Sequence, residues 1–266
     1  MHQRSLMYKS QVLPQLNDEI RDQNILLAFA QQRANRHAES CQTLERAMRI
    51  QMAHNGEYNY KTAQVLCQLG DAQTNCSLAD EAIQHYEQAC MILTKLEGEE
   101  AKPSGRAKEQ LEASELSKVH LKLDKVHLKL IDLYLDTQQA LQCKQIISLV
   151  ERRLDSISTS QEYAYRLMNE LANSLHQHQE YDQALIYYKK ALLCMKRRHK
   201  NKYIAQPETA KILINIATVH FVVRDLAESL KYYQHALEVL YRVEVDSEDN
   251  IAERGKVHMS LASLNR

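Results

Sequence analysis

Small and apolar residues recur along this chain at a spacing that predicts pairs of helices. In residues 66–89, Gly70 is followed by Ala82, Tyr86 and Ala89 at intervals of twelve, four and three residues. The same spacing occurs in four other windows, at residues 24–47, 127–150, 168–191 and 213–236. Two antiparallel helices approach closely only where side chains are small, so each window predicts one helical hairpin. A single hairpin cannot bury its apolar face, so neighbouring hairpins are expected to stack.

Residues that break helices are rare and fall between the predicted hairpins. The chain has 5 glycines and 3 prolines in 266 residues, too few for the frequent turns of a sandwich, barrel or propeller. Polar residues are expected to form turns at 75–77, 178–180 and 224–225. Pro207 is expected in the first turn of a helix, where its missing N–H costs nothing. The composition therefore predicts an all-α protein.

The spacing resembles that of the tetratricopeptide repeat family. The resemblance rests on the windows above and on the segments Ala79–Ile83 and Tyr181–Leu185. Residues at the position of Gly70 in successive windows, of which only Ile131 is not small, are 42, 61, 41, 45 and 45 positions apart. This is longer than the family's usual period of about 34 and similar to the extended repeats of kinesin light chains. The resemblance implies a right-handed superhelical solenoid of helix-turn-helix repeats.

The spacing divides the chain into five parts. They are a lead-in at 1–19, repeats 1 and 2 at 20–97, a charged loop insertion at 98–115, an irregular repeat 3 at 116–155, and repeats 4 and 5 with the first helix of a truncated repeat 6 at 156–266. The loop is expected because it holds two of the five glycines and one of the three prolines. A near-duplication follows, at 118–123 and 125–130, whose seven-residue spacing favours one long helix although its alternation permits a strand.

The first helix of each hairpin is expected to line a concave groove. By helical spacing, one face of these helices carries amides and charges, and amides pair with both the N–H and the C=O of an extended peptide. The predicted groove residues are Gln64, Asp71, Asn75, Lys125, Lys129, Asp132, Arg166, Asn169, Asn173, Gln177, Lys211 and Asn215. A solvated helix face without a partner remains the alternative interpretation.

A more specific site, a clamp for a C-terminal carboxylate, is disfavoured. Some family members build this clamp from two lysines, two asparagines and one arginine. Asn173, Asn215 and Lys256 fall at three matching places, but Asn169 and Ser260 stand where two cations belong. An anion needs those cations.

Other clusters have simpler explanations than a metal or anion site. His176 and His178 do not share a helix face, and His120 and His127 lie seven apart because of the near-duplication. The basic run at 196–202 is compatible with a nuclear signal or an anionic partner, but it also suits a helix C-terminus. We expect no cofactor and no metal.

Charge and cysteine content narrow the partners and the compartment. The 34 basic and 34 acidic residues cancel, which argues against general nucleic-acid binding. No apolar run is long enough to span a membrane, and the N-terminus lacks a secretory core. The six cysteines form no C-x-x-C pair and no zinc pattern. We expect free thiols in an intracellular, most simply cytoplasmic, protein, with cytoskeletal or nuclear placement as alternatives.

The sequence contains none of the common catalytic motifs, such as G-x-S-x-G, H-E-x-x-H or a glycine-rich phosphate loop. We therefore expect a non-catalytic scaffold or adaptor that binds a peptide or partner protein in the groove. The alternatives are a structural spacer in a cytoskeletal or ciliary assembly and a regulatory domain of a longer polypeptide. The truncated sixth repeat indicates a fragment, or an end covered by another chain. The pattern leaves the oligomeric state open.

Overall fold

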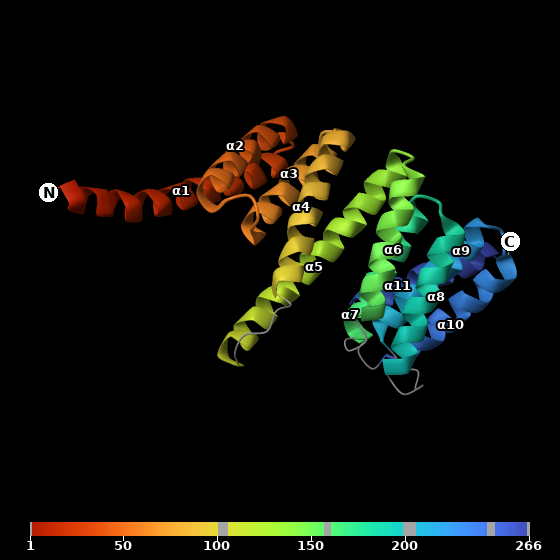
Figure 1. Ribbon diagram of the computed structural model, residues 1–266. Helices are drawn as coiled ribbons and strands as arrows, with labels where there is room; N and C mark the ends of the chain where they lie inside the picture. The colour runs from red at the N-terminus through yellow and green to blue at the C-terminus, as the bar shows by residue number, and fades with distance from the viewer. Residues whose placement is uncertain (1, 101–105, 157–160, 199–205, 244–247, 265–266) are drawn as a thin grey trace. The chain divides into compact units, whose positions relative to one another are not determined.

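The computed structural model describes residues 2–100, 106–156, 161–198, 206–243 and 248–264. It divides into two compact units, residues 1–146 and residues 147–266, which we describe separately. All regular structure in the described ranges is helical, as predicted (Figure 1). The helices are α1 (His2–Arg33), α2 (His37–Asn55), α3 (Tyr60–Asn75), α4 (Ala79–Glu100), α5 (Arg106–Asp136), α6 (Ala140–Ser156), α7 (Gln161–Gln177), α8 (Tyr181–Arg198), α9 (Pro207–Val222), α10 (Leu226–Arg242) and α11 (Glu248–Leu264).

Within each unit, neighbouring helices pack as hairpins and the hairpins stack in chain order. In the first unit α1 packs against α2 and α3 against α4, whereas in the second α7 packs against α8 and α9 against α10. Contacts of α2 with α3, α4 with α5, α8 with α9 and α10 with α11 join each hairpin to the next. This is the packing that the repeated spacing predicts. Pro207 is the first residue of α9, also as predicted.

The turn inside each hairpin has the same backbone conformation at every repeat. A residue with positive φ follows the first helix at Asn35, Ser77, Gln138, Gln179 and Arg224. The next amide donates to a carbonyl five residues back, for example Leu78 to Gln73 at 3.0 Å. This hydrogen bond closes the helix as a Schellman motif, which usually has glycine at the left-handed position. Polar residues stand there instead, so the chain turns with very few glycines.

The small residues of the repeat lie where the two helices of a hairpin cross. In the first hairpin the Ser40 hydroxyl donates to the carbonyl of Ala28 across the crossing, at 3.1 Å, and Ser229 makes the equivalent bond in a later hairpin. In the second hairpin the ring of Tyr86 lies on Gly70, where an added Cβ would come within 2.8 Å of it. The crossing therefore has room only for small side chains.

One predicted boundary is wrong. The segment 98–115 was expected to be a charged loop, but α4 continues to Glu100 and α5 begins at Arg106, so only residues 101–105 lie outside the described helices. The segment is rich in Glu, Ala and Lys, which favour helix, and an exposed glycine such as Gly98 costs a helix only about 1 kcal/mol. The near-duplicated residues 118–130 are helical within α5, as predicted. Of the expected lead-in, 1–19, residues 2–19 are part of α1.

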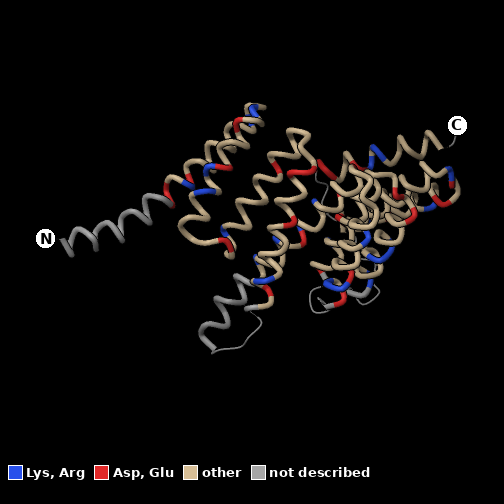
Figure 2. The backbone as a smooth tube through the Cα atoms, turned by 45° about the horizontal axis from the view of Figure 1, so that its top comes forward, with Lys and Arg blue, Asp and Glu red and all other residues tan. Residues whose placement is uncertain are grey.

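Charges of both signs are interspersed along the described helices (Figure 2). Many of these charges pair within one helix, as in the exposed pair of Arg166 with Glu162, whose atoms are 2.8 Å apart. None of the described helices combines the length and the apolar character that crossing a bilayer requires.

Candidate functional site

Side chains of α1 and α3 line two adjoining cavities in the first unit. One cavity, of about 370 Å³, is lined by Arg21, Asp22, Ile25, Leu26, Lys61, Gln64, Val65 and Gln68. The other, of about 200 Å³, is lined by Ile25, Ala28, Phe29, Gln32, Leu44, Gln68, Asp71 and Lys122. Because Ile25 and Gln68 line both, the two cavities adjoin each other, and we call the pair the α1–α3 groove. It follows the first helices of the first two hairpins, the helices expected to line a groove.

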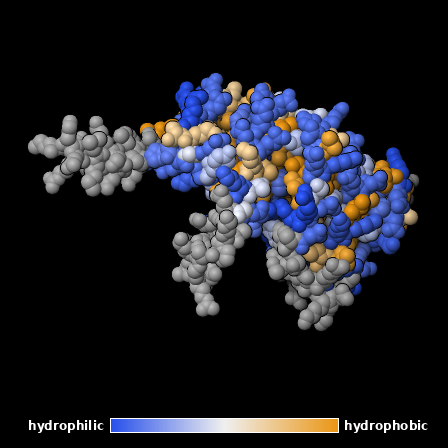
Figure 3. Space-filling model, viewed as in Figure 1, coloured by the Kyte–Doolittle hydropathy of each residue, from blue (hydrophilic) through white to orange (hydrophobic). Residues whose placement is uncertain are grey.

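The α1–α3 groove combines exposed apolar side chains with amides. Leu26 is 68% exposed and Phe29 46% exposed, and apolar side chains on this part of α1 lie beside hydrophilic ones (Figure 3). The buried oxygen Oε1 of Gln68 has no hydrogen-bond partner among the residues that the structure describes. A buried acceptor without a donor costs free energy, so this oxygen favours any ligand that brings an N–H to it. The groove can therefore hold an apolar side chain and hydrogen-bond the backbone beside it.

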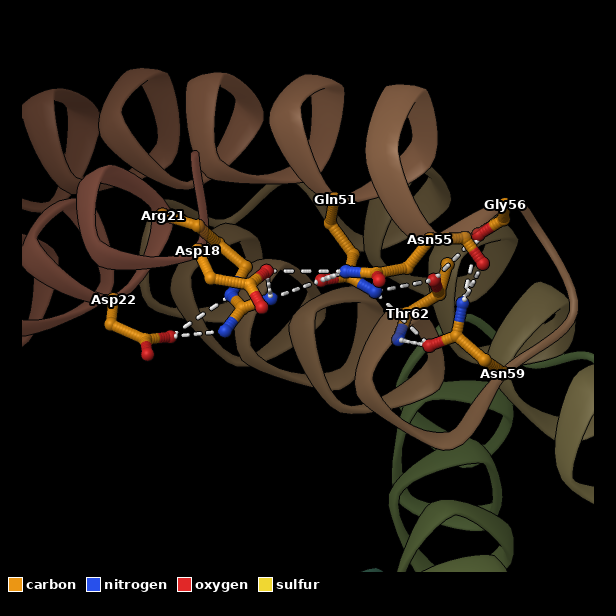
Figure 4. Close-up of polar contacts among 8 residues, drawn as sticks. All are labelled: Asp18, Arg21, Asp22, Gln51, Asn55, Gly56, Asn59 and Thr62. Atoms are coloured by element: carbon orange, nitrogen blue, oxygen red, sulfur yellow. Dashed lines mark hydrogen bonds and ion pairs between the residues drawn. The ribbon is translucent and has the colours of Figure 1, made fainter. Parts of the chain in front are cut away.

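A buried polar network fixes one end of the groove (Figure 4). Arg21, which is 4% exposed, donates from Nη1 to Oδ1 of Asp18 at 2.5 Å and to Oε1 of Gln51 at 2.8 Å. Its Nε donates to Oδ1 of Asp22 at 2.9 Å. Gln51 in turn donates to the hydroxyl of Thr62 at 3.2 Å. The network thereby links α1, α2 and α3, and α1 and α3 form the walls of the groove.

A tyrosine of the second helix braces the opposite side of the groove. The Tyr86 hydroxyl donates to Oδ1 of Asp71 at 2.6 Å, and Nζ of Lys129 on α5 lies 3.7 Å from the same oxygen. Burial, together with the carboxylate of Asp71, raises the pKa of Tyr86 far above its usual value, so the phenol keeps its proton. Burial likewise raises the pKa of the nearby Cys67 to about 11, which the positive charge of Lys122 opposes.

The second unit repeats this bracing. The Tyr188 hydroxyl donates to Oδ1 of Asn173 at 2.7 Å, and Nδ2 of Asn215 on α9 donates to the same oxygen at 3.1 Å. The hydroxyls of Tyr233 and Thr218 are 3.1 Å apart in the next hairpin. Each tyrosine contacts the residue fifteen positions before it, so three hairpins share one internal contact.

The structure brings some of the predicted groove residues together and leaves others apart. In the first unit, Gln64 and Asp71 line the α1–α3 groove, and Lys129 contacts Asp71. Asn173 and Asn215 meet in the second unit. The exposed residues in the predicted set are Gln64, Asn75, Lys125, Lys129, Arg166, Gln177 and Lys211, whereas Asp132 and Asn169 are partly buried. The Asn169 oxygen Oδ1 is buried and, like that of Gln68, lacks a hydrogen-bond partner within the described residues.

Sequence reasoning missed the contribution of α1. Leu26, Phe29 and Gln32 all line the groove, but no residue of the first hairpin was among those predicted. A usable signal was present, because the spacing applied to the other first helices places Asp22, Ile25 and Phe29 on the groove face when it is counted from Ala28.

The histidines singled out by the sequence form no common site within the described residues. His120 pairs with Glu97 at 3.0 Å, whereas His127 is buried and its Nε2 lies 3.3 Å from the Cys90 sulfur. Burial lowers the pKa of His176. Among the described residues no group of three or more His, Cys, Asp or Glu is arranged to bind a metal. Most of the basic run 196–202 lies outside the residues whose side chains are described.

The residues considered for a carboxylate clamp are engaged with one another and with acidic groups. Asn173 and Asn215 are hydrogen-bonded to each other, and Lys256 pairs with Glu253 at 3.0 Å. The clamp, disfavoured by sequence for want of two cations, gains no support.

Comparison with known proteins identifies the class of repeat. Residues 166–200 and 209–244, which span α7–α8 and α9–α10, match the family model of the tetratricopeptide repeat. Two segments of the second unit therefore match this repeat, and the predicted resemblance is confirmed. No match was found among curated protein sequences.

Solved structures with a similar fold were also found. A chain described as nearly identical kinesin-light-chain TPR-like repeats of Podosopora anserina is 15% identical, with a TM-score of 0.59, over 86% of this chain and 98% of that one. BtubC (BKLC) from P. vanneervenii is 15% identical, with a TM-score of 0.54, over 89% of this chain and 84% of that one. At this identity the likeness establishes the fold alone: a helical-repeat solenoid similar to those of kinesin-light-chain-like proteins.

Proposed function

We propose that this protein is a non-catalytic interaction module that holds an extended segment of a partner protein in the α1–α3 groove. Tetratricopeptide folds are typical of protein-interaction scaffolds, which makes binding the coarse expectation. The observation that supports this particular site is the unpaired oxygen of Gln68 between the exposed side chains of Leu26 and Phe29. A peptide N–H satisfies the oxygen, and an apolar peptide side chain covers the exposed carbons.

The geometry also sets the chemistry of the partner. The groove offers an aliphatic and an aromatic surface together with the amides of Gln32, Gln64 and Gln68, so an extended backbone with one or two large apolar side chains fits it best. Arg21 is already held by two aspartates, so it adds little attraction for an acidic partner.

The test is a selection from a random peptide library displayed on phage, followed by fluorescence anisotropy with the selected peptide. Leu26→Glu should weaken binding about tenfold or more, because burying a leucine side chain contributes roughly 1.5–3 kcal/mol. Met91→Glu is the matched control, since Met91 is an exposed apolar residue of the second-helix layer on α4. Circular dichroism verifies that both variants fold. Equal loss of affinity in both variants, or a peptide that binds both as it binds the unaltered protein, would refute the groove.

A second candidate, a spacer that binds through its turns, is favoured by one observation. The α9–α10 turn exposes four apolar side chains close together, namely Phe221, Val222, Val223 and Leu226. Exposed apolar groups at a hairpin turn suit contact with a large partner rather than with a peptide. Under this alternative, Val222→Lys with Val223→Lys abolishes partner capture and Leu26→Glu does not.

A further inference from the structure

Two thiols of the first unit lie against each other at the edge of its core. Cys41 is on α2, and Cys76 follows the last residue of α3, in the turn that leads to α4. Their sulfur atoms are 3.8 Å apart, and both cysteines are free. Cys41 is 8% exposed, whereas Cys76 is partly open to solvent. One thiol is thus accessible to a reagent and the other is held directly behind it.

The surroundings allow the sulfurs to approach without disturbing a helix. A disulfide needs about 2.05 Å between sulfurs, so the separation of 3.8 Å has to shorten by roughly 1.8 Å. Cys76 is not inside a helix, because it caps α3 and precedes Ser77, the left-handed residue of the turn. A rotation about its side-chain bond and a small shift of the turn supply the movement, while Cys41 stays packed among Leu44, Leu69 and Ala72.

We propose that Cys41 and Cys76 are a redox-active pair that a low-molecular-weight disulfide, such as glutathione disulfide, converts to an intramolecular disulfide bond. In the first step the thiolate of Cys76 attacks one sulfur of the oxidant, forming a mixed disulfide and releasing one thiol. In the second step the thiolate of Cys41 attacks the Cys76 sulfur, and the second glutathione leaves as a thiol. The two cysteines lose two electrons and two protons, and the oxidant is reduced to two thiols.

The environment of Cys41 sets the conditions for this reaction. Burial, followed by the neighbouring thiol of Cys76, raises the pKa of Cys41. Little Cys41 thiolate is present at neutral pH, so the second step is slow there and becomes faster as the pH rises. The short distance between the two sulfurs partly offsets the low thiolate fraction, because the second step is intramolecular.

The bond would form beside the α1–α3 groove. Cys41 and Cys76 belong to the same packed cluster as Ala28 and Ile25, which line the groove, and Leu44 belongs to both. Oxidation therefore ties the end of α3 to α2 under one wall of the groove. The modification itself does not depend on the groove being a binding site, and its test involves no partner.

The experiment incubates the folded protein with glutathione disulfide at pH 8 and maps the products by mass spectrometry. Trypsin with Asp-N protease separates the relevant cysteines, because Cys41 falls in residues 37–46, Cys67 in 62–70, Cys76 in 71–79 and Cys90 in 80–95. The expected product joins 37–46 to 71–79 with the loss of two hydrogens. Cys41→Ser should stop the reaction at a glutathione adduct on Cys76, which identifies the order of the two steps.

A second probe keeps the proposal testable if a variant fails to fold. Phenylarsine oxide bridges two neighbouring thiols, so the unaltered protein should retain one arsenic on the same two peptides. Cys90 is the internal control, since it is partly exposed and its sulfur contacts His127 instead. The proposal is overturned if Cys76 carries glutathione while Cys41 remains a free thiol, or if the linked peptides contain other cysteines. Circular dichroism during the reaction must show that the chain stays helical.

Discussion

Removing the guanidinium of Arg21 should destabilise the first unit far more than removing an exposed one. Arg21→Met keeps most of the aliphatic stem and deletes the hydrogen bonds from Arg21 to Asp18, Asp22 and Gln51 that Figure 4 shows. Gln51 is fully buried, so the loss of its charged donor leaves Oε1 with only the Asn55 amide, at 3.3 Å. We expect the largest part of the effect at Gln51.

The magnitude follows from the burial of each partner. A hydrogen bond from a charged donor to a buried acceptor contributes about 1.5–3 kcal/mol. The partly exposed carboxylates of Asp18 and Asp22 regain water on losing Arg21, so each adds less than about 1 kcal/mol. The residual bond from Asn55 offsets some of this. We therefore expect a fall of roughly 2–3 kcal/mol in the free energy of unfolding of the first unit.

The assay combines urea unfolding with hydrogen exchange, because the chain has two units. Exchange read by mass spectrometry should show faster opening of α1, α2 and α3 in Arg21→Met and no change in α9 and α10. Arg166→Met is the matched control, since Arg166 makes an exposed pair with Glu162 and should lose less than about 0.5 kcal/mol. Arg21→Lys should fall between, because lysine keeps the charge but lacks the planar fork. If Arg21→Met and Arg166→Met differ by less than about 0.5 kcal/mol, the network does not hold the helices together.

Four further outcomes follow from local contacts. Burial raises the pKa of Asp18, but the hydrogen bond from Asn55 and nearby cations outweigh it, so the folded pKa lies below the usual value. Its stabilisation is present above about pH 4 and lost as the pH falls through the folded pKa, and Asp18→Asn should reduce this acid dependence in urea titrations. Gly255→Ala should raise stability by about 1 kcal/mol in thermal unfolding, because Gly255 lies inside α11 with no atom within 4 Å of an added Cβ. Gln179→Gly should add about 0.5–1 kcal/mol by the same measurement, because φ is 64° there. Closing the Cys41–Cys76 bond across 35 residues should add about 4 kcal/mol, measured by urea unfolding with and without reductant.

The repeat could be predicted from the sequence because its signal is steric. Helices cross at Ala28 and Ser40 or at Gly70 and Ala82 only if both residues of the pair are small. The spacing that permits the crossing can therefore be read from the sequence. The same holds for the turns, which fall where polar residues interrupt the apolar pattern. Even the irregular third hairpin, which lacks the small pair, keeps its turn at Gln138.

The extent of α4 and α5 could not be predicted, because the signal there is ambiguous. Gly98 and Pro103 favour a loop, while the alanines, glutamates and lysines around them favour helix.

The exposure of a side chain is equally hard to predict from sequence. Leu26 and Phe29 look like core residues by composition, and only the packing of α1 against its neighbours decides that they face solvent.

The groove prediction rested on one assumption that the contacts revise. The residue after each small residue was expected to face a partner, but Asp71 and Asn173 already accept hydrogen bonds from the tyrosines of their own hairpins. These positions therefore brace the hairpin. The oxygens of Gln68 and Asn169, two and three residues before the small residue, are buried without a partner in the described part of the chain. A ligand that binds the first helices should consequently form hydrogen bonds with Gln68 and Asn169. Substitution of Gln68 or Asn169 should therefore remove direct contacts with the ligand and change its affinity more than the loss of direct contacts at Asp71 or Asn173 does.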